Sequence, residues 1–224
     1  GKPIINLTVG EPDFDTPEFI KQAARLALDE GFTKYTAVDG MLRLKQAVID
    51  KFKHENKLDY ALDQVIVSSG AKQSIYNLMQ SLLNPGDEVI IPAPYWVSYP
   101  DMALLAEAKP VFISGSIESC LKITPQQLEA AITEKTRLFI INSPSNPTGM
   151  VYTHAELNEL AKILLRHPKV FILTDDIYEH IYWGSESFNN IINICPELYD
   201  RTLVLNGCSK AYAMTGWRIG YAAG

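Results

Sequence analysis

Short apolar segments rich in β-branched residues alternate along this chain with longer segments whose apolar residues recur every three or four positions. The short segments predict strands buried on both faces of a sheet, and the longer ones predict amphipathic helices. The predicted strands cover 65–67, 88–92, 110–113, 138–141, 170–173 and 202–205, and the predicted helices cover 17–30, 42–52, 71–83, 125–133 and 154–166, with a weaker one at 97–106. This alternation predicts an α/β fold, a mostly parallel sheet with helices on both faces.

The two ends of the chain are harder to interpret. Residues 217–222 could add one more strand, whose direction the pattern does not give. We expect residues 1–38 to form a separate N-terminal segment and residues 39–224 to form one large domain. Because the chain opens directly on an apolar stretch and stops inside a predicted strand and turn, we expect a fragment of a longer protein.

Composition narrows the class of protein. Hydrophobic residues make up 47% and charged residues 21%, as in ordinary globular chains. The net charge of −6 comes without a basic cluster, so we expect no nucleic-acid partner. The three separated cysteines and four histidines show no metal-binding or disulfide spacing, so we expect no metal and a reducing cytoplasm. No apolar run is long enough to span a membrane, and we expect no membrane partner.

Polar or flexible residues follow five of the predicted strands. In open α/β sheets, ligands gather at the carboxyl ends of the strands. The segments at these ends are Ser69–Lys72, Pro94–Trp96, Asn142–Gly149, Asp175–Tyr178 and Ser209–Lys210. Together they suit one small, flat, anionic ligand.

Two of these segments favour binding of a charged group. The strand that turns through Gly70 into a helix would present free N–H groups and the positive end of the helix dipole, which suits a phosphate, although such junctions are often only structural. Asp175 directly follows an apolar strand. It is either an ordinary turn residue or a carboxylate held beside a buried strand by a positive partner such as a protonated pyridine nitrogen.

The remaining segments add an amide and an amine. Pro144 and Pro147 bracket Asn146, which predicts a rigid extended stretch that fixes its amide. Lys210 has apolar and aromatic neighbours in the sequence, and burial there would lower its pKa and give the neutral amine that Schiff-base chemistry needs. Arg218, eight residues further on, could form a bidentate contact with phosphate.

The stretch Ser209-Lys210-Ala211-Tyr212-Ala213-Met214-Thr215-Gly216-Trp217-Arg218-Ile219-Gly220-Tyr221 resembles the lysine signature of the fold-type I, class I aminotransferases, which depend on pyridoxal phosphate. Other motifs of that family follow in its order. They are Asn6–Phe14, Lys34-Tyr35-Thr36, Ser69–Lys72, Pro94-Tyr95-Trp96, Asn146–Gly149 and Asp175–Tyr178. The resemblance covers essentially the whole chain and is strongest to the bacterial-type aspartate aminotransferases, so it implies the large domain of that fold.

The resemblance implies a role for each motif residue. Lys210 would hold pyridoxal phosphate as a Schiff base and then move the proton between the substrate Cα and the cofactor, while Asp175 would pair with the ring nitrogen. Asn146 and Tyr178 would hydrogen-bond the ring 3′-oxygen, and Trp96, or else Tyr95, would lie on the ring. The residues that would bind the phosphate are Gly70, Ala71, Lys72, Ser209, Arg218 and, from a neighbouring subunit, Tyr35. Gly10 would approach the substrate carboxylate, with Trp96 and Asn146 also on the substrate side.

Two departures from the family pattern bear on activity. Asp176 stands where the family often has glutamate, which should matter little. The C-terminal small domain, which in the family carries the arginine for the substrate α-carboxylate, has no counterpart in these residues. We therefore expect the Schiff base to form but normal turnover to need more than this chain.

Several functions remain open on this scaffold. The leading one is transamination between an L-amino acid, with aspartate favoured, and a 2-oxo acid such as 2-oxoglutarate, in a homodimer with shared sites. Aromatic, alanine and kynurenine aminotransferases share the same cofactor residues. A β-elimination lyase would release pyruvate and ammonia without an acceptor. The sensing domain of a transcription regulator would need an upstream helix-turn-helix, and a plain α/β binding domain would never take up the cofactor.

Overall fold

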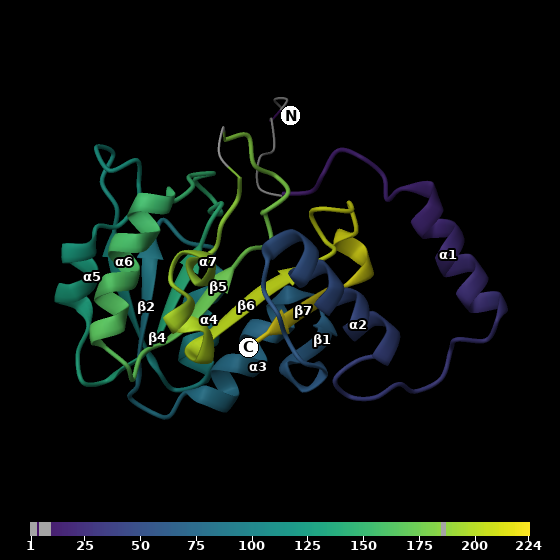
Figure 1. Ribbon diagram of the computed structural model, residues 1–224, viewed down its shortest axis with the longest axis horizontal. Helices are drawn as coiled ribbons and strands as arrows, with labels where there is room; N and C mark the ends of the chain where they lie inside the picture. The colour runs from purple at the N-terminus through teal and green to yellow at the C-terminus, as the bar shows by residue number, and fades with distance from the viewer. Residues whose placement is uncertain (1–3, 5–9, 185–186) are drawn as a thin grey trace.

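The computed structural model of the chain describes residue 4, residues 10–184 and residues 187–224. The start of the predicted Asn6–Phe14 motif, residues 6–9, therefore lies outside the described residues. Within them, a twisted sheet of seven strands forms the centre of the molecule, with helices around it (Figure 1). The predicted α/β class is confirmed.

The predicted elements are present, with small shifts at their ends. The strands are β1 Val65–Ser69, β2 Glu88–Ala93, β3 Lys109–Ser114, β4 Thr136–Asn142, β5 Phe171–Asp175, β6 Thr202–Gly207 and β7 Ile219–Ala223. The helices are α1 Glu18–Asp29, α2 Leu42–Lys51, α3 Ala71–Leu82, α4 Ser98–Leu105, α5 Pro125–Ala131, α6 His154–Arg166 and α7 Ile191–Ile194. A π-helical turn, Phe52–Asn56, continues α2, and three 3-10 turns cover Leu62–Gln64, Pro196–Arg201 and Thr215–Trp217.

The strand order is β1-β7-β6-β5-β4-β2-β3. Neighbours run parallel except at β7, which is antiparallel to both β1 and β6. The last strand was predicted at residues 217–222, slightly too early, since Trp217 belongs to a 3-10 turn and β7 begins at Ile219. Because β7 runs backwards, its first residues lie at the edge where the other strands end.

Alternation along each strand divides the core into two layers. Phe139, Ile172 and Val204 face one layer, which α2, α5, α6 and α7 cover. Leu138 and Leu173 face the other layer, which α3 and α4 cover. Burial of apolar side chains on both faces is the main driving force for this architecture.

The N-terminal segment differs from the rest. Helix α1 extends away from the sheet at the right of Figure 1, and none of its residues is buried, although its apolar and polar residues fall on opposite sides. The segment before it is fixed at Thr16, which donates a hydrogen bond to the Ala213 carbonyl (2.6 Å) and accepts one from the Trp217 indole (3.1 Å). No helix in the described residues is long and apolar enough to cross a membrane.

Candidate active site

Strand register brings the predicted site segments to one edge of the sheet. Asn142 and Asp175, the last residues of β4 and β5, are paired neighbours. Gly220, near the start of β7, is paired with Ser68 on one side and with Gly207 on the other. The turns that follow β1 and β6 therefore flank the start of β7, and the ends of β4 and β5 lie further along the same edge.

One corner of this edge has the properties of an anion site. Gly70 has φ +84°, a left-handed conformation that favours glycine, and a Cβ there would lie 2.7 Å from the Cζ atom of Arg218. The Arg218 guanidinium thus packs directly against the start of α3. It also donates to the carbonyl of Thr215, in the 3-10 turn before β7, at 2.8 Å. No side chain caps α3, so N–H groups of its first turn face outward beside a guanidinium.

Lys72 and Trp96 stand next to this corner. The Lys72 Nζ atom lies 4.9 Å from the centre of the Trp96 ring, a cation–π distance. Trp96 in turn packs edge-on against Tyr99, with 5.4 Å between ring centres. The half-buried indole therefore lies between Lys72, at the start of α3, and Tyr99, which binds the carboxylate of β5.

Asp175 is a buried carboxylate that accepts two hydrogen bonds. The Tyr99 hydroxyl donates to its Oδ2 atom at 2.6 Å, and the Ile177 N–H donates to its Oδ1 atom at 3.3 Å. Burial raises the pKa of Asp175 to about 6, and the two hydrogen bonds pull it back. Among the described residues no ion pair involves Asp175, so a cationic ring nitrogen at this point would supply the missing partner.

Asn146 and Tyr178 lie beside this carboxylate. The Asn142 side chain donates to the Asp175 carbonyl (2.9 Å) and accepts from the Asn146 N–H (2.7 Å), which ties the two strand ends together. Burial raises the pKa of Tyr178, the charge of Asp175 adds to this effect, and a hydrogen bond with Asn146 opposes it. Asn146 and Tyr178 thus contact each other, as an amide–phenol pair for one ring oxygen requires.

The expected extended stretch around Asn146 was wrong. Residues 146–148 form a turn, closed by a hydrogen bond of 2.8 Å from the Gly149 N–H to the Ser145 carbonyl. The two prolines restrict the backbone, but its conformation depends on the hydrogen bond to the Asn142 side chain and on the bond that closes the turn. Neither contact is visible in the local sequence.

Lys210 lies in the turn between β6 and β7. Its Nζ atom donates to the Gly10 carbonyl at 2.5 Å and lies 5.7 Å from the centre of the Tyr178 ring. Burial lowers the pKa of the amine, the Glu11 carboxylate opposes this, and Arg218 acts in the same direction as burial. The predicted direction of the pKa shift is therefore the one found.

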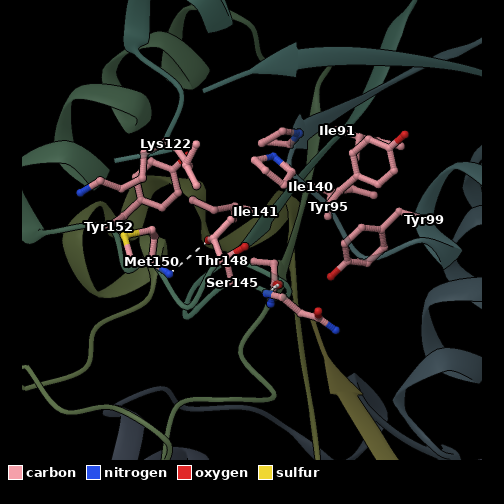
Figure 2. A pocket seen from close by; sticks show the side chains of 15 residues that line it. Ile91, Tyr95, Tyr99, Lys122, Ile140, Ile141, Ser145, Thr148, Met150 and Tyr152 are labelled. Carbon is pink, nitrogen blue, oxygen red and sulfur yellow. Dashed lines mark hydrogen bonds between the residues drawn. The ribbon is translucent and has the colours of Figure 1, made fainter. Parts of the chain in front are cut away.

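A small pocket of about 30 Å³ adjoins the site, enough for one or two water molecules. Figure 2 shows Tyr95 and Tyr99 on one side of it, and Tyr152 and Met150 on the other. Its lining includes Asn142 and Asn146. The pocket thus lies at the carboxyl ends of β2 and β4, next to polar side chains of the candidate site.

Other predicted residues are placed with less detail. Ala71 begins α3, and Ser209 is buried beside Lys210. Gly10 is present through its carbonyl group, which contacts the Lys210 amine. Tyr35 is fully exposed (107%) and is not gathered with the other residues, so within one chain it adds nothing to the site.

Sequence reasoning missed Tyr99 and the structural role of Asn142. The only local signal for Tyr99 is its position three residues after Trp96, at the start of a weakly predicted helix. That spacing does not reveal a hydrogen bond to a strand 76 residues away. Asn142 was included only as the first residue of a loop.

The comparisons with known proteins agree with this geometry. The family model for aminotransferases of class I and II matches residues 2–224. An aspartate/prephenate aminotransferase of Nitrosomonas europaea is 60% identical over the whole chain, and one of Cereibacter sphaeroides is 59% identical. The chain belongs to the class I and II aminotransferase family.

Solved structures give the same fold. An aspartate aminotransferase from Rhizobium meliloti matches the whole chain with a TM-score of 0.98 and 54% identity. A double mutant of the Thermus thermophilus aspartate aminotransferase matches 97% of the chain with a TM-score of 0.92 and 45% identity. The chain spans 56% of the length of each of these relatives.

Proposed function

We propose that the protein containing this chain transfers an amino group between L-aspartate and a 2-oxo acid, with pyridoxal phosphate as cofactor. The observation that carries the proposal is the convergence of Lys210, Asp175 and the Gly70–Arg218 corner on one sheet edge, in a chain of the aminotransferase family. An amine, a carboxylate and an anion site in this order match the three polar ends of the cofactor. The names of the relatives favour aspartate as the amino donor.

The residues fit the cofactor at each of its polar groups. Gly70, Ala71, Lys72, Ser209 and Arg218 would hold the phosphate, because N–H groups and cations gather where a side chain at position 70 would fill the space. Asp175 would face the ring nitrogen, and Asn146 with Tyr178 would bind the ring oxygen. Trp96 would cover one face of the ring. The bound cofactor supplies an electron sink for the carbanion formed at the substrate Cα.

Lys210 would do the proton chemistry. Its lowered pKa keeps more of the amine neutral, as both covalent attachment to an aldehyde carbon and general-base action require. Freed from the cofactor by the substrate amine, the side chain would move a proton between the substrate Cα and the cofactor C4′. Its contact with the Gly10 carbonyl supports a substrate side formed in part by the N-terminal segment.

The acceptor and the assembly extend the proposal. Relatives at 60% and 59% identity are named aspartate/prephenate aminotransferases, which favours prephenate as a second acceptor besides 2-oxoglutarate. The fully exposed Tyr35 favours a homodimer in which it reaches the partner's phosphate corner. Residues 1–38 would form part of the substrate side and residues 39–224 the cofactor domain. Three free cysteines favour a cytoplasmic location.

The test compares the full-length protein with its Lys210→Ala variant. The wild type should bind pyridoxal phosphate with a visible absorption band that borohydride fixes covalently, and should convert aspartate only when a 2-oxo acid is present. K210A should lose covalent fixation and at least a thousandfold of the transfer rate. Lys162→Ala, an exposed lysine of α6, is the matched control and should behave as wild type.

Three results would contradict the proposal. If the wild-type protein lacks the absorption band, the chain is better explained as a plain α/β binding domain that does not take up pyridoxal phosphate. Release of ammonia without an acceptor would favour a lyase. Full transfer activity in K210A would remove the lysine from the mechanism. Aromatic amino acids, alanine and kynurenine should be poorer donors than aspartate in the same assay.

A further inference from the structure

Glu179 is a buried carboxylate that the proposed mechanism does not use. It directly follows Tyr178, and its side chain is 4% exposed. The side chains of Asn56 and Asn206 donate to it at 2.6 Å and 2.7 Å, and Lys51 forms an ion pair with it. A buried carboxylate with three donors is fixed in one orientation, because any other would leave a charged group unpaired in the interior.

The three donors come from parts of the chain that are distant in sequence. Lys51 ends α2, and Asn56 ends the π-helical turn that continues it. Asn206 belongs to β6, four residues before Lys210. One carboxylate therefore links the segment that carries Tyr178, the strand that leads to Lys210, and a helix that covers the sheet.

The π-helical turn fits this linking role. Wider turns of this kind are rare and occur frequently at functional sites. Here the turn directs Asn56 onto Glu179 and Glu55 onto His180, which lie 3.1 Å apart at Oε2 and Nε2. The carbonyl of Asn56 also accepts from the Asn193 side chain at 2.6 Å.

A metal ion is a poorer explanation of this cluster. Ligand atoms of Glu55, Glu179 and His180 lie within 4.8 Å of one another. However, the Lys51 ammonium group already occupies the side of Glu179 that a cation would need, at a pairing contact with that carboxylate. The charge of the buried carboxylate is thus matched from within the chain.

We propose that Glu179 is a positioning residue, which through Lys51, Asn56 and Asn206 holds the Tyr178 side chain and the Lys210 turn in register with each other. The proposal rests on the proposed function, since it assigns Tyr178 and Lys210 to the same bound cofactor. The connection is short. The Tyr178 carbonyl accepts from the Ile181 N–H at 2.8 Å and the Glu179 N–H donates to the Asp176 carbonyl at 2.9 Å, so the backbone that carries Tyr178 is a tight turn. Rotation of Glu179 would rotate this turn.

The experiment uses the full-length protein and its Glu179→Gln variant. Gln keeps the size of the side chain but removes the buried charge beside Lys51, which is left with the more exposed Glu55 carboxylate at 3.7 Å. It also places an N–H donor opposite the donors Lys51, Asn56 and Asn206. We expect the dissociation constant for pyridoxal phosphate to rise about tenfold, as for loss of a hydrogen bond to a charged group. The visible circular dichroism per bound cofactor should also fall, because it reports how firmly the ring is oriented.

Controls separate positioning from stability. Glu159→Gln removes a carboxylate of α6 that is 52% exposed and forms its ion pair with Lys162, and should leave both readouts unchanged. Lys51→Met should reproduce the defect, and the double variant should be no worse than either single variant. If E179Q does not fold, Asn206→Ala, which removes one neutral donor, carries the test with the same two readouts.

The outcomes are distinct from those of the proposed function. A wild-type protein that takes up no pyridoxal phosphate overturns the proposed function. A wild type that binds it, together with a folded E179Q that binds it with the same dissociation constant and the same visible circular dichroism, overturns the positioning role alone. A lower unfolding temperature in E179Q with both cofactor readouts unchanged also overturns it.

Discussion

At the scale of single residues, Asp175 lowers the stability of the folded protein in a way that binding of a cationic group would offset. A carboxyl group with no cation partner among the described residues is buried at the end of β5, and burial raises its pKa to about 6 from an ordinary value of 3.8. A group whose pKa is raised by folding costs stability wherever it is ionised in the folded protein, so the cost is present above about pH 6 and disappears as the pH falls towards 4. A cationic ring nitrogen would remove the same cost by pairing with the carboxylate.

Asp175→Asn should therefore stabilise the cofactor-free protein. At pH 8 we expect a gain of roughly 1–3 kcal/mol, because a shift of about two pKa units corresponds to about 3 kcal/mol at most and the amide oxygen can still accept from Tyr99. The gain should shrink between pH 6 and pH 4. Urea unfolding at pH 8 and pH 4.5 measures it, and a difference that is equal at both values would contradict this account.

Tyr99→Phe should act on the same carboxyl group in the opposite direction. Loss of the hydroxyl removes a hydrogen bond that lowers the pKa of Asp175, so the pKa rises further. Because pairing with the cofactor needs the ionised form, the affinity for pyridoxal phosphate should begin to fall at a higher pH than in wild type, and should be about tenfold weaker near pH 7.

A titration of cofactor affinity between pH 5 and pH 9 measures this shift. Tyr152→Phe is the matched control, since Tyr152 lines the same pocket and its hydroxyl accepts from the Ile123 N–H at 3.1 Å, away from Asp175. Identical profiles for Y99F and Y152F would remove Tyr99 from the site.

At the scale of elements, the reversed strand β7 determines how the anion corner is built. Gly220 lies where β7 passes under the start of α3, and a Cβ there would lie 2.6 Å from the Cα atom of Ala71. The contact is with backbone, which cannot move without displacing the helix. Glycine is therefore required here for close approach and not for its conformational freedom.

Gly220→Ala should weaken both the fold and the anion site. Overpacking of this kind costs about 1–3 kcal/mol, and displacement of the first turn of α3 should lower the affinity for pyridoxal phosphate several-fold. Gly216→Ala is the control, because a Cβ at that position meets no atom within 4 Å. Thermal unfolding and cofactor titration of both variants test the prediction, which fails if G220A matches G216A.

Sequence reasoning recovered most of the elements because their apolar periods differ so clearly. The helix His154–Arg166 was predicted to the residue from its apolar spacing, and the structure adds a capping box of Thr153 and Glu156 at its start. The direction of β7 could not be predicted, because an apolar run reports burial and not orientation. Likewise the lysine and arginine of the site were found from local motifs, whereas Tyr99 and Glu179 act through contacts with distant segments.

At the scale of the whole molecule, the N-terminal part of the chain exposes side chains to solvent. Tyr35 is fully exposed, and α1 has no buried residue. If Tyr35 completes the phosphate corner of a partner subunit, each site of the dimer draws on two chains. Complementation between two defective subunits can test this arrangement without any structure of the dimer.

Subunits with Lys210→Ala and subunits with Tyr35→Ala should complement each other. A hybrid dimer has one site with an intact lysine and an intact partner tyrosine, so random mixing should restore about a quarter of the wild-type sites. Transfer activity at limiting pyridoxal phosphate, measured before and after co-refolding, gives the result. Activity equal to the average of the two parents would contradict a shared site.

The hairpin formed by β6 and β7 has a consequence for how proteins of this design can change. Gly207 and Gly220 are paired across it, and the Cys208 N–H donates to the Ile219 carbonyl at 3.1 Å, so both ends of the connection are anchored in the sheet. Lys210 and Arg218 therefore lie on one connection whose two ends are fixed by strand pairing. In the proposed aminotransferase, substitutions among the other residues that line the site can therefore alter which amino acid is accepted. The distance between the groups that hold the two ends of the cofactor stays constant.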